Sequence, residues 1–419
     1  MAGNTIGPAA SKTGTESGGK KSERLHYLDW LQVVAVLGVV LFHAMFPFDD
    51  LVDWNIKNVE KSALATLYSV FFTPWGMAFF FSMAGVTSWF SLRRRTAGRY
   101  VRERVIQLLI PFIVGAIVLT PIHAYYELTH RGWWKGNSIV EFIRSSEART
   151  YFYTQHHRIT PGPEAFSNLG YHLWFVAFLF LFSLLALPIF MWLKGDSGKR
   201  FVDSLARLAK RRGGLLVFVF PPIVIRFILQ PFFPDYTGWS DFFFHLAFFI
   251  SGYILMADER FMPAIRRDWR LYLMLGIACK LLFFSVAAGV PVLDWMESPG
   301  TPEFYVIWTV FGINAWSWTM VMFCVGMRFL DFTNKWLQYS REASFPLFWV
   351  HHPVSFFVAF YVVQWEAALL IKLLAVVLGT FALTLVWYEL LVRRVNPVRR
   401  LFGMKPRKRK ELQARTSLA

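Results

Sequence analysis

The sequence predicts an all-α, polytopic membrane helix bundle of about ten transmembrane helices, with both ends of the chain in the cytoplasm. Three observations predict it. Of the 419 residues, 55% are hydrophobic and 18% aromatic, and the mean hydropathy is +0.40. Only 17% are charged, and they gather in short clusters between long apolar runs, as expected where hydrocarbon excludes ions. Basic and acidic clusters also alternate along the chain. Together these features exclude a water-soluble globule.

Ten apolar segments are long enough for the roughly 20 residues that a helix needs to cross about 30 Å of hydrocarbon. We expect them at 28–47, 64–90, 105–126, 171–193, 214–232, 240–257, 271–291, 304–328, 342–363 and 367–392. The boundaries are least defined in the fifth segment, with Pro221 and Pro222, and in the ninth, with Pro346 and Pro353. The first segment lacks the small-residue cleavage site of a secretory signal, so we expect a retained anchor.

Residues 1–26 are expected to be a disordered cytoplasmic tail because they are rich in Gly, Ser, Thr and Lys. Residues 27–395 then form the ten-helix membrane domain, and 396–419 form a basic cytoplasmic tail. The two cysteines, Cys279 and Cys324, lie in apolar runs. We therefore predict no disulfide framework and no metal site.

Orientation follows from the loops, since cytoplasmic loops carry the excess of Lys and Arg. The basic connections are 20–24, 91–104, 194–213, 266–267 and 393–410, and the acidic or mixed ones are 49–53, 127–170, 235, 294–303 and 366. Ten spans with both ends inside satisfy every loop. The net charge of +17 is thereby explained by topology, and no nucleic-acid partner is expected because the basic residues form no single stripe.

The longest external connection, 127–170, is rich in aromatic and histidine side chains. It holds Trp133, Trp134, Tyr151, Tyr153, His156 and His157. A loop of this length either faces a substrate at the outer mouth or caps the membrane interface. The sequence leaves both interpretations open.

Polar groups inside spans are costly and therefore mark candidate sites. On the first helix these are Asp29, Gln32 and His43. Gln32 and His43 are eleven residues apart, close to three helical turns, so they share one face about 16 Å apart along the axis. The alternative is that Asp29 caps the helix and His43 anchors at the interface.

Further titratable groups are expected in the outer half of other spans or at mid-membrane depth. They are His123, His172, Arg226, His245, His351 and His352. Histidine is the usual general acid or base near neutral pH, so a shared cavity would suit proton transfer. The alternative for each is a hydrogen-bonded or interfacial side chain; near Pro353, a His satisfying the carbonyl that the proline frees would suffice.

The cytoplasmic loop before the third span is strongly basic. It contains Arg93, Arg94, Arg95, Arg99, Arg102 and Arg104 beside one acid, Glu103. Guanidinium groups bind phosphates bidentately, so this loop is suited to a phosphorylated donor such as a nucleotide or coenzyme A. Anchoring to anionic lipid is the alternative. No dinucleotide fingerprint, P-loop, His-Glu-x-x-His pair or Gly-x-Ser-x-Gly elbow is present.

An ordered set of short motifs resembles the acyltransferase 3 family of integral membrane acyltransferases. The motifs are Tyr27-Leu28-Asp29-Trp30-Leu31-Gln32 with Leu41-Phe42-His43, Phe79-Phe80-Phe81-Ser82-Met83-Ala84-Gly85, Arg102-Glu103-Arg104 ahead of Ile110-Pro111, His172-Leu173-Trp174-Phe175, Phe249-Ile250-Ser251-Gly252-Tyr253, His351-His352-Pro353 and Tyr388-Glu389-Leu390. The His-His-Pro run is most similar to the glucan biosynthesis protein C branch.

The resemblance implies O-acylation at or across the cell (inner) membrane, from cytoplasmic acyl-CoA to a hydroxyl, usually on a glycan, with no permanently bound cofactor. His43 matches the family's first-helix histidine and is the expected general base. Arg102 and Arg104 match the arginine motif near the donor phosphates, and Asp29 and Gln32 are expected to contact the donor. Two positions depart from the family pattern, which has Arg in many members at Gln32 and at Gln107. A proton-coupled transporter or flippase and a non-catalytic sensor on the same scaffold are the rival interpretations.

Overall fold

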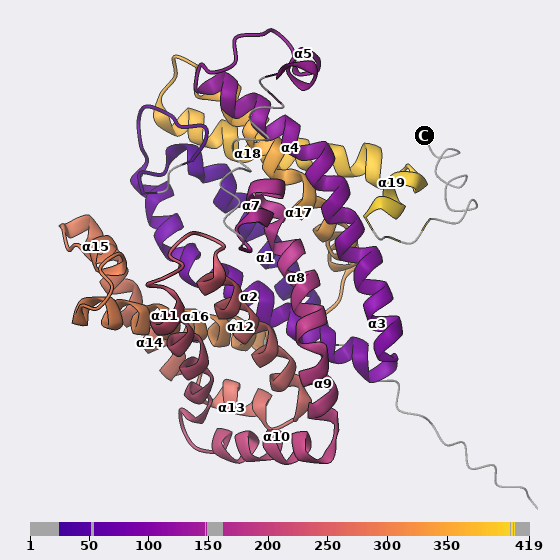
Figure 1. Cartoon of the computed structure of the whole chain (residues 1–419), viewed down its shortest axis with the longest axis vertical. Helices are drawn as coiled ribbons and strands as arrows, with labels where there is room; N and C mark the ends of the chain where they lie inside the picture. The colour runs from indigo at the N-terminus through magenta and orange to yellow at the C-terminus, as the bar shows by residue number, and fades with distance from the viewer. Residues whose placement is uncertain are drawn as a thin grey trace, which may run out of the picture.

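The described part of the chain is built from helices and connecting turns. The structure is a computed structural model that describes residues 25–51, 54–146, 148, 162–402, 404 and 406, and these contain no strand. Residues 1–24 of the predicted tail 1–26, and the residues Tyr151, Tyr153, His156 and His157, lie outside the described residues, whereas His26 begins α1. The end of α4 and α5 lie at one end of the molecule, and α10 and α13 lie at the other (Figure 1).

Within the described residues, eight helical segments are long and apolar enough to cross a membrane. They are α1 (His26–Met45) with η1 (Phe46–Phe48), α2 (Ala63–Arg94), α3 (Ala97–Arg104) continuing through η2 (Val105–Leu109) into α4 (Ile110–His130), α7 (Ala165–Gly170) through η3 (Tyr171–Leu173) into α8 (Trp174–Leu185), α12 (Trp239–Ala257), α16 (Pro302–Phe329), α17 (Lys335–Val362) and α18 (Leu369–Trp387) with η6 (Tyr388–Val392). The prediction of a multi-pass, all-α membrane bundle is confirmed.

The fifth and seventh predicted spans fall on shorter helices. The fifth is η4 (Gly214–Val219) followed by α11 (Phe220–Leu229), and the seventh is α14 (Trp269–Phe284) followed by η5 (Ser285–Ala288). A run of 16 residues, such as α14, rises only about 24 Å. The count of ten spans and the direction of the chain therefore stay predictions.

The remaining described helices are short and lie between or beside the long ones. They are α5 (Ile139–Arg144), α9 (Leu187–Lys194), α10 (Asp196–Ala209), α13 (Phe261–Arg267), α15 (Val292–Met296) and α19 (Asn396–Leu401). The fourth predicted span, 171–193, is accordingly divided between η3, α8 and α9, with Pro188 near the start of α9.

The closest helix pairing joins α2 to α12 through two glycines. A Cβ on Gly85 would lie 2.0 Å from the Phe249 carbonyl oxygen, and a Cβ on Gly252 would lie 2.0 Å from the Ser82 carbonyl oxygen. Ser82 Oγ also donates to the Phe248 carbonyl at 3.3 Å. Small residues allow such close backbone contact between membrane helices. Two of the motifs singled out in the sequence thus build the scaffold, while α1 packs against α17 and carries the site.

Candidate functional site

Five histidine rings meet where α1, α4, η3 and α17 come together. His43 lies on α1, His123 on α4, His172 on η3, and His351 and His352 on α17. The His43 ring centroid lies 5.0 Å from that of His351 and 4.7 Å from that of His352, and His172 stacks on His352 at 4.5 Å. The sequence predicted all five as candidates, and the structure places them in one cluster.

Of the five, four are buried and one has accessible surface. His123, His172, His351 and His352 are buried, whereas His43 is half-buried. His43 also stacks against Trp54, with ring centroids 5.8 Å apart. Trp54 lies in the connection between the first two spans and was not predicted, because a loop tryptophan carries no sequence signal for contact with a particular ring.

Pro353 organises the cluster through the backbone carbonyl of Trp349. Proline has no N–H, so within a helix the carbonyl four residues earlier loses its usual donor. His172 fills that place, because its Nε2 lies 3.0 Å from the Trp349 oxygen. A histidine satisfying the freed carbonyl was one interpretation of the sequence, but the histidine comes from another helical segment.

The hydrogen bonds fix which nitrogen of His43 carries the proton when the rings are neutral. His351 Nδ1 lies 2.6 Å from the Phe348 carbonyl oxygen, and a carbonyl only accepts, so this nitrogen is the N–H. Its Nε2 is then an acceptor, and it lies 2.9 Å from His43 Nδ1. His43 Nδ1 must therefore donate, which leaves His43 Nε2 with a lone pair.

The same reasoning gives a second lone pair in the cluster. His172 Nε2 donates to the Trp349 carbonyl, so its Nδ1 is the unprotonated nitrogen, and this buried atom has no hydrogen-bond partner. Such a group is costly to bury and is typical of a functional position.

Three of the rings have nitrogens spaced as a candidate metal-binding group. One nitrogen each from His123, His172 and His352 lies within 4.8 Å of the others. However, His352 Nδ1 and His123 Nε2 are 2.7 Å apart, which is a hydrogen-bond distance. Two ligands of a tetrahedral zinc, with bonds of about 2.0–2.1 Å, would be about 3.3 Å apart. As they stand, these rings are hydrogen-bonded imidazoles.

Two other predicted residues, Arg226 and His245, belong to a separate polar group. Arg226 donates to Gln230 at 2.7 Å, to Ser240 at 3.1 Å and to Asp241 at 2.5 Å. His245 Nδ1 lies 2.8 Å from the Asp241 carbonyl oxygen. Asp241 was not predicted from the sequence, although its place in the first turn of α12 puts it at the same depth as Arg226, in the last turn of α11.

A pocket of about 320 Å³ approaches the cluster from the side of α3, a helix within the predicted basic loop that carries Arg102 and Arg104. Its polar lining is Gln32, Thr87, Arg104 and Gln107, and most of the rest is apolar, including Phe80, Phe175, Phe345 and Phe348. The Phe348 ring also lies 5.7 Å from the rings of His172 and His351. One aromatic side chain therefore separates the pocket from the imidazoles.

The predicted donor-binding residues do not all line this pocket. Arg104 lines it and bonds Ser88 Oγ at 3.1 Å, whereas Arg102 is exposed nearby on α3. Asp29 forms an ion pair with Arg341 at 3.4 Å. Gln107 lies in the π-helical turn η2, a feature often found at functional sites.

Comparisons with known proteins agree with the resemblance seen in the motifs. The model of the acyltransferase 3 family, described as an acyltransferase domain, matches residues 25–389. Relatives named glucans biosynthesis protein C, from Salmonella agona and Salmonella heidelberg, are 23% and 22% identical over 406 residues, which cover 93% of this chain and 97% of each relative. No solved structure matches the chain.

Proposed function

Because the chain belongs to the acyltransferase 3 family, and is thus a multi-pass membrane acyltransferase, we propose that it moves an acetyl, succinyl or similar acyl group from cytoplasmic acyl-CoA to a hydroxyl of an extracytoplasmic glycan. The relatives' name, glucans biosynthesis protein C, supports a glycan as the acceptor. The observation that carries the proposal is the lone pair on His43 Nε2, on the one ring of the cluster that is not buried.

His43 acts as the general base in this proposal. Its Nε2 takes the proton from the acceptor hydroxyl while the hydroxyl oxygen bonds to the thioester carbonyl carbon. The carbon–sulfur bond then breaks, and the departing thiolate takes the proton back from Nε2, so the ring ends neutral. His351 Nε2 accepts the hydrogen bond from His43 Nδ1 throughout, which holds the ring in place and stabilises its charged form.

The donor enters from the side of α3. Arg102 and Arg104 contact the coenzyme phosphates, and the pocket beside Gln32 receives the narrow pantetheine arm. A pocket of about 320 Å³ is small for a ligand site, which suits the arm and leaves the nucleotide at the basic surface. Asp29 does not line the pocket, so its part in donor binding is indirect, through its ion pair with Arg341.

The test is replacement of His43 in purified full-length protein in lipid nanodiscs. We expect His43→Ala to lower glucan-dependent release of coenzyme A by about 10²–10⁴-fold, the contribution typical of general-base catalysis. His26→Ala is the matched control, since His26 begins the same helix at its other end. Full transfer by the His43 variant would remove the proposed base.

The same assay separates the rival interpretations. Release of coenzyme A that requires added glucan supports the acyltransferase. Proton-coupled uptake of a solute without thioester consumption would instead support a transporter.

A further inference from the structure

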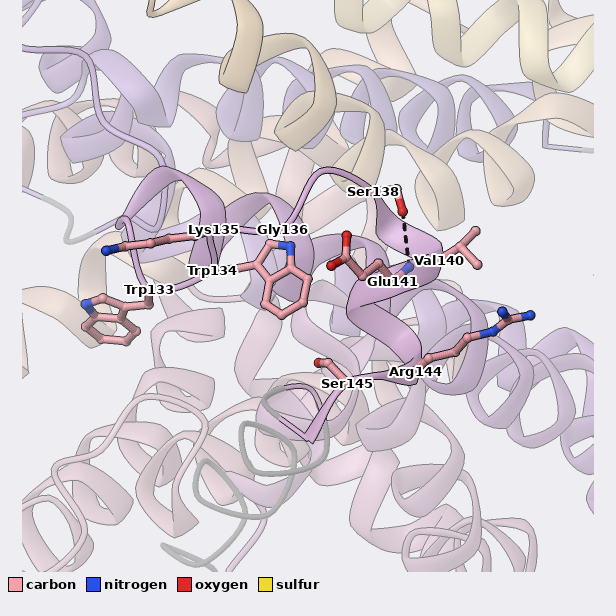
Figure 2. Close-up of a pocket in the computed structure, with 9 residues that line it drawn as sticks. All are labelled: Trp133, Trp134, Lys135, Gly136, Ser138, Val140, Glu141, Arg144 and Ser145. Atoms are coloured by element: carbon pink, nitrogen blue, oxygen red, sulfur yellow. Dashed lines mark hydrogen bonds between the residues drawn. The ribbon is translucent and has the colours of Figure 1, made fainter.

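A second hollow lies far from the donor pocket, where the chain leaves α4 and forms α5. It has a volume of about 930 Å³ and is lined by side chains that include Trp133, Trp134, Lys135, Glu141 and Arg144. Figure 2 shows Trp133, Trp134 and Lys135 on the turn before α5 and Glu141 and Arg144 on α5 itself, with the Trp134 ring beside the Glu141 carboxylate. We name this hollow the tryptophan groove.

The groove combines exposed aromatic surface with charged groups of both signs. Trp133 is 65% exposed, and the Arg131 guanidinium lies 5.4 Å from its ring. Sugars present C–H faces that pack on indole rings, and hydroxyl groups that bond to carboxylates and cationic donors. An indole has both the apolar body and the polar edge that such a ligand needs. The lining therefore fits a carbohydrate better than it fits a purely apolar or purely ionic ligand.

The groove is held in shape by its own hydrogen bonds. The backbone N–H groups of Trp133 and Trp134 both donate to the Leu128 carbonyl, at 2.9 and 3.1 Å. Glu141 Oε2 accepts from the Asn137 N–H at 3.1 Å, and Trp134 packs edge-to-face on buried Phe142, with ring centroids 5.4 Å apart. A preformed site loses little conformational entropy on binding.

Gly136 keeps the space between two of the groove's walls open. A Cβ at this position would lie 2.3 Å from the Trp134 ring and 3.0 Å from Glu141 Oε2. A larger residue would therefore push the two side chains apart.

The groove is connected to the imidazole cluster through α4. Leu128, which anchors the two tryptophans, follows His123 by five residues, or about 7.5 Å along the helix. The Lys57 N–H also donates to His130 Nε2 at 3.2 Å, so the connection that carries Trp54 is fastened to the same helix end. An oligosaccharide of a few units would reach from the tryptophan groove along the end of α4 to the imidazole cluster.

We propose that the tryptophan groove binds a neutral oligosaccharide, one to three sugar units away from the hydroxyl that is acylated. This inference rests on the proposed function, whose acceptor it names. A lipid surface is the main alternative occupant, since tryptophan is common at membrane interfaces. The hollow shape and the charged lining favour the sugar, because an interfacial anchor needs neither.

The experiment measures KM for linear glucose oligosaccharides of one to eight units, and KM for acyl-CoA, in nanodiscs. We expect Trp133→Ala and Glu141→Gln to raise KM for the long oligosaccharides about tenfold and to leave KM for acyl-CoA unchanged. The increase in KM should disappear for glucose itself, which is too short to occupy both the tryptophan groove and the site of acylation. Trp365→Ala is the control, since Trp365 is 47% exposed on the same predicted side of the membrane.

Two outcomes would contradict oligosaccharide binding in the tryptophan groove. The first is a KM for long oligosaccharides that Trp133→Ala changes no more than Trp365→Ala does. The second is an effect of Trp133→Ala on the unfolding temperature in nanodiscs with no change in KM for the oligosaccharides, which would assign the groove to the membrane.

Direct titration of the protein with the eight-unit oligosaccharide keeps the two proposals separable. Binding that depends on Trp133 in a protein that releases no coenzyme A would support the groove and contradict the acyl transfer. Transfer to glucan without a role for Trp133 would support the acyl transfer and contradict the groove as a binding site. Absence of binding to the unaltered protein would also contradict the groove as a binding site.

Discussion

The imidazole cluster and the Arg226 group are both polar islands inside an apolar bundle, but their hydrogen bonds are arranged differently. The Arg226 charge is met by Asp241, and the guanidinium also lies 4.5 Å from the rings of Phe244 and Trp308. The second Asp241 oxygen accepts from the Thr237 N–H at 2.7 Å. The histidines bond to one another and to backbone carbonyls, and three lone pairs remain: those of His43 Nε2 and His172 Nδ1, and one on the hydrogen-bonded pair of His123 and His352. The first arrangement joins helices, and the second leaves atoms available for chemistry.

The largest expected effect that distinguishes the Arg226 group from the imidazole cluster is a loss of folding stability. Asp241→Asn leaves the Arg226 charge buried without its counter-ion, so we expect the free energy of unfolding to fall by about 3–5 kcal/mol. Thermal unfolding in detergent would measure it. Activity per folded molecule should change far less than in the His43 variant.

A double replacement provides the control for the Arg226 group. Arg226→Met with Asp241→Leu removes both charges, and such exchanges are often neutral or stabilising. We expect it to recover most of the lost stability. If the double variant folds well but has lost transfer, Arg226 takes part in the chemistry and the comparison fails.

A smaller effect is expected at His351, which acts through His43. His351→Ala removes the acceptor for His43 Nδ1 and frees the ring to turn, so kcat should fall roughly 10²-fold, within the range that general-base catalysis supplies. His351→Gln offers an amide oxygen as acceptor and should restore much of the rate. Equal kcat values for the two variants would mean that the hydrogen bond at 2.9 Å does not position the base.

Replacement of Pro353 tests whether the lone pair on His172 Nδ1 is needed for activity. Pro353→Ala returns an N–H that competes with His172 for the Trp349 carbonyl. We expect little change in unfolding temperature, because a helical hydrogen bond is gained, but a loss of activity of about tenfold as His172 turns. Unaltered activity would show that the orientation of His172 is not needed.

Much of the fold was predictable from the sequence because hydropathy and loop charge report directly on membrane spans. The helical pattern also placed Gln32 and His43 on one face, and the structure has Gln32 in the pocket that we propose for the donor and His43 in the cluster. Partners were not predictable. His43 and His351 are 308 residues apart, and their contact depends on how α1 packs against α17.

The short helices of the fifth and seventh predicted spans and the position of Arg226 were not predictable, for related reasons. Apolar composition sets a minimum for a span, but the helix of the fifth segment begins at a 3-10 turn and two prolines. Titratable residues at one depth were expected to share a cavity, yet depth does not specify which helix face they occupy. Arg226 and His245 therefore lie in a group of their own.

The smallest effect is expected from Gln32→Arg, which gives the proposed donor pocket the arginine that many family members have at this position. Gln32 and Gln107 both line it and are exposed, so an arginine at either place needs no burial of charge. Because Arg104, which is proposed to contact the phosphates, lines the same pocket as Gln32, Gln32→Arg should add attraction for them, lower KM for acyl-CoA about three- to tenfold and leave KM for the glycan unchanged. Gln338→Arg, at an exposed position on α17, controls for added charge at the surface. A gain confined to binding of coenzyme A, with no transfer before or after the change, would favour the sensor interpretation. Unchanged KM values would place the phosphates outside the pocket, at the exposed guanidinium of Arg102, so that only the uncharged arm passes Gln32 on its way to the imidazoles.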